Sequence, residues 1–183
     1  MTDLESRAKA FATKCHAGQL RKYTGEPYIN HPAAVVELVR SVPHTEAMLA
    51  AAWLHDTVED TTATHEDILR EFGADVFALV GMLTDASKPE HGNRAARKRI
   101  DLEHLAGAYP DAKTIKLADL IDNTRSIVAH DKNFAKVYLA EKIALLPVLI
   151  AGDTLLWDCA DLLARSSLRA IEFPSLHSRA NGI

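Results

Sequence analysis

Three short polar segments interrupt otherwise apolar stretches of this sequence, and they contain side chains that bind metal ions. His31 lies in the first segment, His55 and Asp56 are adjacent in the second, and Asp119 lies in the third. Two imidazoles and two carboxylates form a mixed nitrogen and oxygen donor set, which suits Mn²⁺, Fe²⁺ or Zn²⁺ and leaves coordination positions for water. We therefore predict that these four residues bind a divalent cation.

The second segment adds two further acids to the His-Asp pair. Glu59 follows His55 by four residues and Asp60 follows Asp56 by four, so one more helical turn would bring them close to the pair. This crowding is repulsive unless a cation is present, and it favours a raised pKa in a carboxylate that accepts a proton from water. We predict catalytic roles for Glu59 and Asp60, with a solvated acidic turn as the simpler alternative.

The third segment places Asp119 among apolar neighbours, where an unpaired carboxylate is unfavourable. Asn123 follows one helical turn later and can hydrogen-bond a ligand without adding charge. Two simpler interpretations stay open: Asp119 could pair with Lys116 on the same helix, and His31 could be a capping or core histidine.

Helical periodicity dominates the elements that must position these residues. Apolar residues recur at steps of three and four, and no alternating run of β-branched residues indicates a strand. Thr64 to Asp67 has the pattern of a capping box, and Pro32 suits a first helical turn. We predict an all-α fold, a single bundle of about eight to nine helices, over residues 4–15, 33–42, 46–56, 64–73, 75–83, 94–106, 112–129, 133–151 and 153–170.

Length and composition restrict the class of protein. A chain of 183 residues suits one domain, which we place at 1–173, with 174–183 as a frayed tail. The net charge of −4 argues against a general nucleic-acid partner, and no apolar run is long enough to cross a membrane. Cys15 and Cys159 are far apart and favour free thiols in a reducing cytoplasm.

The polar segments also carry a family resemblance over about residues 4–128. The matching stretches are HAGQLRK (16–22), GEPYINHP (25–32), LHDTVEDT (54–61), LTD (83–85) and KLAD (116–119) with Asn123 four residues later. In this order they resemble the HD-domain phosphohydrolases. Among these, the chain is most similar to the hydrolase domain of the RelA/SpoT alarmone enzymes in its stand-alone form, the small alarmone hydrolases of the metazoan SpoT homologue type. Asp122 and Thr124 depart from the long enzymes of that family.

The resemblance implies hydrolysis of guanosine 3′,5′-bis(diphosphate), or ppGpp, and of its pentaphosphate relative, with release of the 3′-pyrophosphate. Carried over by residue, it gives one Mn²⁺ held by His31, His55, Asp56 and Asp119, and a water positioned and deprotonated by Glu59 and Asp60. The implied substrate contacts are Arg21, Lys22, Asn123 and Tyr138.

Other functions stay open at this point. The same metal chemistry could act on another nucleotide phosphate, such as the 2′-phosphate of NADPH. A non-catalytic alarmone-binding module is also compatible with the fold, although it has no need of Glu59 and Asp60. The basic cluster from Arg94 to Arg99 is expected to be an exposed helical face rather than a phosphate site. The oligomeric state is not indicated.

Overall fold

The computed structural model describes residues 1–173 and confirms the all-α prediction. Within this range lie nine α-helices of eight or more residues, one single-turn α-helix and two short 3₁₀ helices. The α-helices are α1 (Asp3–Cys15), α2 (Asn30–Arg40), α3 (Glu46–Leu54), α4 (Thr57–Asp60), α5 (His65–Phe72), α6 (Ala74–Leu83), α7 (Arg94–Ala106), α8 (Pro110–His130), α9 (Lys132–Leu145) and α10 (Thr154–Glu172), and the 3₁₀ helices are η1 (Pro89–His91) and η2 (Leu146–Leu149). The tail expected at 174–183 lies outside the described residues.

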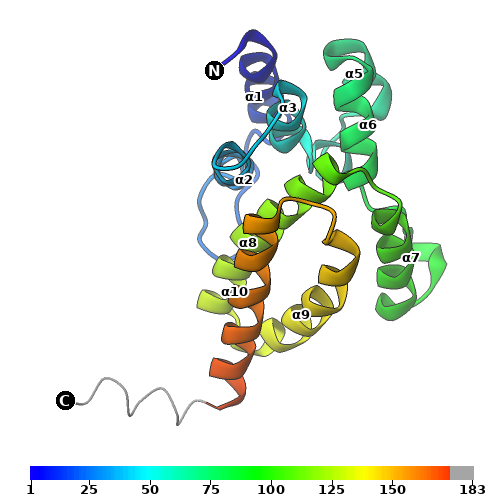
Figure 1. The fold of residues 1–183 in the computed structure, drawn as a ribbon. Coiled ribbons are helices and arrows are strands. Elements are labelled where there is room, and N and C mark those ends of the chain that lie inside the picture. Colours follow the sequence, from blue (N-terminus) through cyan, green and yellow to red (C-terminus); the bar gives the residue numbers. More distant parts are fainter. Residues whose placement is uncertain (174–183) are drawn as a thin grey trace.

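Helix α8 is the central element of the bundle (Figure 1). It packs against α2, α3, α6, α9 and α10. Ile115, Leu117 and Ile121 of α8 are completely buried in the main core. A smaller apolar cluster, which includes Tyr138 and Leu139, joins α8 to α9 and α10. Most side chains of α8 between Ala112 and Thr124 are therefore buried or half-buried in the bundle.

Helix α3 is buried on almost every side, as its apolar sequence predicts. Residues 48–54 are all buried, because α1, α2, α6 and α8 surround the helix. It ends at Leu54, two residues earlier than predicted, and the Thr57 hydroxyl donates a 2.7 Å hydrogen bond to the Leu54 carbonyl. This bond satisfies a carbonyl at the helix end. His55 and Asp56 consequently lie in the turn between α3 and α4.

Other helix boundaries also differ from the prediction, and one of them concerns a site residue. Helix α2 starts at Asn30 rather than Ala33, so His31 lies in the first turn beside Pro32, where proline costs no hydrogen bond. The segment expected as one helix over 133–151 changes into η2 near Pro147. The capping box at Thr64 is confirmed by reciprocal hydrogen bonds with Asp67. Among the described helices, none has the length and hydropathy to cross a membrane.

Candidate functional site

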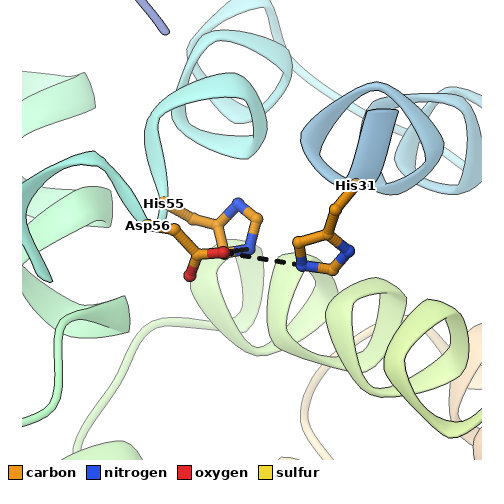
Figure 2. Close-up of side chains that lie close together, drawn as sticks. All are labelled: His31, His55 and Asp56. Atoms are coloured by element: carbon orange, nitrogen blue, oxygen red, sulfur yellow. Dashed lines mark ion pairs between the residues drawn. The ribbon is translucent and has the colours of Figure 1, made fainter. Parts of the chain in front are cut away.

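The four predicted metal ligands meet where α2, the α3–α4 turn and α8 converge. Figure 2 shows His31 on α2 and His55 in the α3–α4 turn, both pointing toward the carboxylate of Asp56. Asp56 Oδ2 lies 3.5 Å from His31 Nε2 and 3.1 Å from His55 Nε2. Asp119 Oδ1 lies 3.3 Å and 3.9 Å from the same two nitrogens. Three of the four residues, His31, His55 and Asp56, present ligand atoms within 4.8 Å of one another.

The chemistry of this cluster fits a divalent cation. His31 Nε2 and His55 Nε2 are buried and have no hydrogen-bond partner among residues 1–173. Each ring is held through Nδ1 instead, by the Ala52 carbonyl for His55 (2.9 Å) and by Asp122 for His31 (2.7 Å). A ring whose Nδ1–H donates a hydrogen bond directs the Nε2 lone pair toward the carboxylates, which is the arrangement that a metal ligand needs.

The electrostatics of the cluster favour positive charge at the same position. Burial alone would lower the pKa of His31, but the nearby carboxylates of Asp119, Asp122 and Asp56 raise it to about 9. Burial likewise disfavours an ionised Asp119, yet Lys116 and the histidines hold the pKa of that carboxyl well below its usual value. Protons on the two histidines can supply this positive charge, and a bound metal ion can supply it in their place.

Both carboxylates of the cluster, Asp56 and Asp119, have further polar partners. The Tyr28 hydroxyl donates to Asp56 Oδ2 over 2.6 Å, and the burial of Tyr28 beside Asp56 raises the pKa of that phenol and keeps it protonated. Lys116 Nζ lies 2.8 Å from Asp119 Oδ2, while Asn123 Nδ2 donates to Asp119 Oδ1 over 2.5 Å. The simpler interpretation of Asp119 as the partner of Lys116 is therefore true of one oxygen, and the other oxygen faces the histidines.

Asp122 is a site residue that the sequence reasoning missed as a functional group. Its Oδ2 accepts hydrogen bonds from His31 Nδ1 at 2.7 Å and from Arg21 at 2.6 Å. Burial alone would raise its pKa, but these two partners hold the pKa of Asp122 below the usual value. The available signal was its position three residues after Asp119, which places both acids on one face of α8.

Glu59 and Asp60 border a cavity of about 480 Å³, which Asp56 and Asp119 also line. The backbone N–H of Asp85 donates to Glu59 Oε1. Solvent reaches Glu59 through the cavity, but the surrounding protein desolvates the carboxyl and raises its pKa to about 7. Desolvation therefore contributes more to the raised pKa of Glu59 than repulsion from the neighbouring acids does. Asp60 accepts a 3.4 Å hydrogen bond from Gln19.

The four expected substrate contacts are divided between two cavities. Asn123 and Tyr138 line the 480 Å³ cavity, and Tyr138 is 6% exposed. Arg21 and Lys22 line a second cavity of about 230 Å³, which Asn123 also borders. Arg21 is held by Asp122, whereas the Lys22 ammonium lies 5.0 Å from the Tyr23 ring centroid.

The basic cluster of α7 is partly exposed: Arg94 and Arg99 lie on the surface, whereas Arg97 and Lys98 are half-buried. Arg94 forms two hydrogen bonds with Glu141 of α9, at 2.6 Å and 2.8 Å. Lys98 lies 3.1 Å from Asp85 and 3.2 Å from Asp101, and it faces the larger cavity. These contacts attach α7 to the rim of that cavity.

Comparison with known proteins adds a family and several relatives. The family model described as HD domain matches residues 8–146. The guanosine-3′,5′-bis(diphosphate) 3′-pyrophosphohydrolase MESH1 of Drosophila melanogaster is 42% identical over 120 residues, which are 64% of this chain and 65% of that protein. The GTP pyrophosphokinase of Streptomyces coelicolor is 36% identical over 160 residues, which are 85% of this chain but 19% of that protein. These matches therefore cover less than two thirds of either relative.

A solved structure of a metazoan ortholog of SpoT, which hydrolyzes ppGpp, superposes with a TM-score of 0.81 at 30% identity. The superposition covers 91% of this chain and 96% of that one. The likeness thus extends beyond the segments that carry the predicted metal ligands and covers most of the helical bundle.

Proposed function

Because the chain belongs to the HD domain family, we propose that it is a metal-dependent hydrolase of guanosine 3′,5′-bis(diphosphate) and its pentaphosphate relative. Water adds to the phosphorus bonded to O3′, the P–O3′ bond breaks, and pyrophosphate leaves with the water oxygen. A proton returns to O3′, so that GDP or GTP remains. The observation that carries the proposal is the convergence of two unpartnered histidine nitrogens and two carboxylates beside an acid-lined cavity in the described chain.

The proposed cofactor is one Mn²⁺ held by His31, His55, Asp56 and Asp119. The nitrogen and carboxylate donors suit this ion, and the hydrogen bonds to both Nδ1 atoms support their orientation. When bound, such an ion lowers the pKa of water and polarises a phosphoryl oxygen.

Glu59 is proposed as the group that receives the proton from the attacking water. A pKa of about 7 lets the carboxyl be ionised before the reaction and hold a proton after it at neutral pH. Asp60 is exposed beside it and is proposed to orient the water. The presence of both acids at the cavity favours turnover over mere binding of the nucleotide.

The remaining proposed roles concern the nucleotide. Asn123 borders both cavities and is placed to bind a ligand that extends from one to the other. Arg21 and Lys22 would flank the base and its phosphates in the smaller cavity, and Tyr138 would contact the nucleotide in the larger one. We further propose residues 1–173 as the hydrolase domain, a cytoplasmic location, and no nucleic-acid partner.

Incubation of the purified protein with Mn²⁺ and a panel of nucleotides tests this function. We expect pyrophosphate and GDP from ppGpp, and no turnover after the double change Glu59→Gln and Asp60→Asn, with Mn²⁺ binding retained. Pyrophosphate release from the double variant at the original rate would show that the catalytic roles are misassigned. If the protein releases phosphate from NADPH and does not react with ppGpp, the proposed substrate is wrong and NADPH takes its place.

A further inference from the structure

Lys142 of α9 lines the 480 Å³ cavity and has no counter-ion within the described chain. No ion pair or hydrogen bond joins its ammonium to another residue of 1–173, and the ammonium lies 5.0 Å from the ring centroid of Tyr138. The neighbouring acid on the helix, Glu141, is occupied by Arg94. Asp119 and Asp85 attract the ammonium from a distance, but no carboxylate of the described residues forms a direct ion pair with it.

The other cations of this cavity are already engaged. Lys116 lies 2.8 Å from Asp119, and Lys98 lies between two carboxylates. Arg99 points largely into solvent, with 77% of its side chain exposed. Among the cavity residues that the structure describes, Lys142 thus combines an enclosed position with an unpaired positive charge.

An enclosed, unpaired ammonium is unfavourable unless a ligand brings an anion. Burial and repulsion from Lys116 lower the pKa of Lys142 to about 8, which records this cost while leaving the amine mostly charged at neutral pH. Tyr138 lies one helical turn earlier, and its buried hydroxyl has no hydrogen-bond partner among the described residues. The two side chains form a ready set of donors on one face of α9.

We propose that Lys142, assisted by the Tyr138 hydroxyl, binds a phosphate group of the substrate other than the one attacked at the metal centre. The inference rests on the proposed function, since a bis(diphosphate) brings further phosphates into the same cavity. Lys142 contacts none of the four proposed metal ligands, which separates its phosphate from the reacting one. This phosphate is either the terminal group of the 3′-diphosphate or one of the 5′-diphosphate.

Calorimetric titration of the Mn²⁺-loaded Glu59→Gln/Asp60→Asn protein with ppGpp tests the inference without turnover. Adding Lys142→Met should raise the Kd at least tenfold, as expected for loss of a charge-assisted hydrogen bond, and Lys142→Arg should recover most of the affinity. Lys136→Met changes an exposed lysine of the same helix and should leave the Kd unchanged. An unchanged Kd in Lys142→Met refutes the inference.

Two shorter nucleotides identify the phosphate. Guanosine 5′-diphosphate 3′-monophosphate lacks the terminal 3′ group, and guanosine 3′-diphosphate lacks the 5′ groups. We expect one of them to bind the Lys142→Met protein as tightly as the protein that retains Lys142, because it lacks the phosphate that the lysine holds. Equal weakening of both shorter nucleotides would overturn the assignment to a non-reacting phosphate.

The outcomes separate the two proposals. Absence of ppGpp binding before the lysine is changed refutes the proposed function together with this inference, whereas binding that Lys142→Met does not weaken refutes the inference alone. The thermal midpoint of Lys142→Met should equal or exceed that of its parent, because no ion pair is lost. A large decrease of the midpoint would indicate a structural lysine and also count against the inference.

Discussion

Replacing Asp122 should weaken metal binding without removing any metal ligand. Its carboxylate holds His31 by a 2.7 Å hydrogen bond to Nδ1, so Asp122→Ala frees the ring to rotate and to change tautomer. The expected loss of metal affinity can be judged in two ways. Loss of an outer-shell partner of a metal-bound histidine typically costs about 10- to 100-fold in affinity. One hydrogen bond to a charged group contributes about 1.5–3 kcal/mol, which corresponds to a similar range.

The assay is the Kd for Mn²⁺, measured by calorimetry at one pH for the wild-type and variant proteins. Asp122→Asn keeps an acceptor oxygen for His31 and should lose less affinity than Asp122→Ala. Arg21→Met removes the other partner of Asp122 but leaves the bond to His31, so its Kd should stay within about threefold of wild type. Asp158→Ala alters an exposed acid of α10 and serves as the matched control.

An unchanged Kd in Asp122→Ala would refute this reasoning, since the orientation of His31 would then depend on packing alone. A loss of Mn²⁺ affinity in Arg21→Met as large as that in Asp122→Ala would also refute the reasoning. The effect would then come from the Arg21–Asp122 ion pair and not from the orientation of the His31 ring.

Three further predictions concern the metal, the proton and the fold. His55→Ala should abolish stoichiometric Mn²⁺ binding and lower the thermal midpoint, because it removes a ligand that also compensates the nearby carboxylates; full occupancy by metal analysis would contradict the ligand set. At saturating Mn²⁺, turnover should rise about tenfold per pH unit below a pH of about 7 and level off above it, because Glu59 accepts a proton only when ionised. A rate independent of pH between 5 and 8 would exclude Glu59 as the base. Thr64→Ala should cost about 1 kcal/mol and lower the midpoint by about 2–4 °C through loss of the capping box, with the Mn²⁺ Kd unchanged in the same preparation.

The helices were predictable because their signals are local. The signals are the periodic apolar residues, the capping box at Thr64, and the glycines and prolines that end helices. Each of them acts within a few residues along the chain. One boundary that was wrong is at the site itself, where α3 ends at Leu54 and the His55-Asp56 pair lies in a turn. That turn depends on a hydrogen bond from Thr57 and on the surrounding helices, neither of which appears in a hydrophobic pattern.

The metal-binding hypothesis was accessible from sequence for a related reason. A histidine or carboxylate embedded in an apolar helix needs a polar or charged partner. The sequence shows this requirement even though it does not show where the partner lies. The groups that support the candidate ligands, by contrast, could not be identified from the sequence. Asp122 meets His31 across 91 positions of the chain and Arg21 across 101, and only the packing of α2 and the preceding loop on α8 decides those contacts.

The sequence by itself therefore determined the all-α class and indicated the candidate donor residues and the acids beside them, because each follows from local pattern or from the cost of burying charge. Tertiary structure alone decided that Arg21 pairs with Asp122, that the expected substrate contacts divide between two cavities, and that Lys142 faces one of them without a counter-ion within the described residues. These features depend on which helix faces meet, and the periodicity of one helix shows that it has a buried face but not what lies opposite.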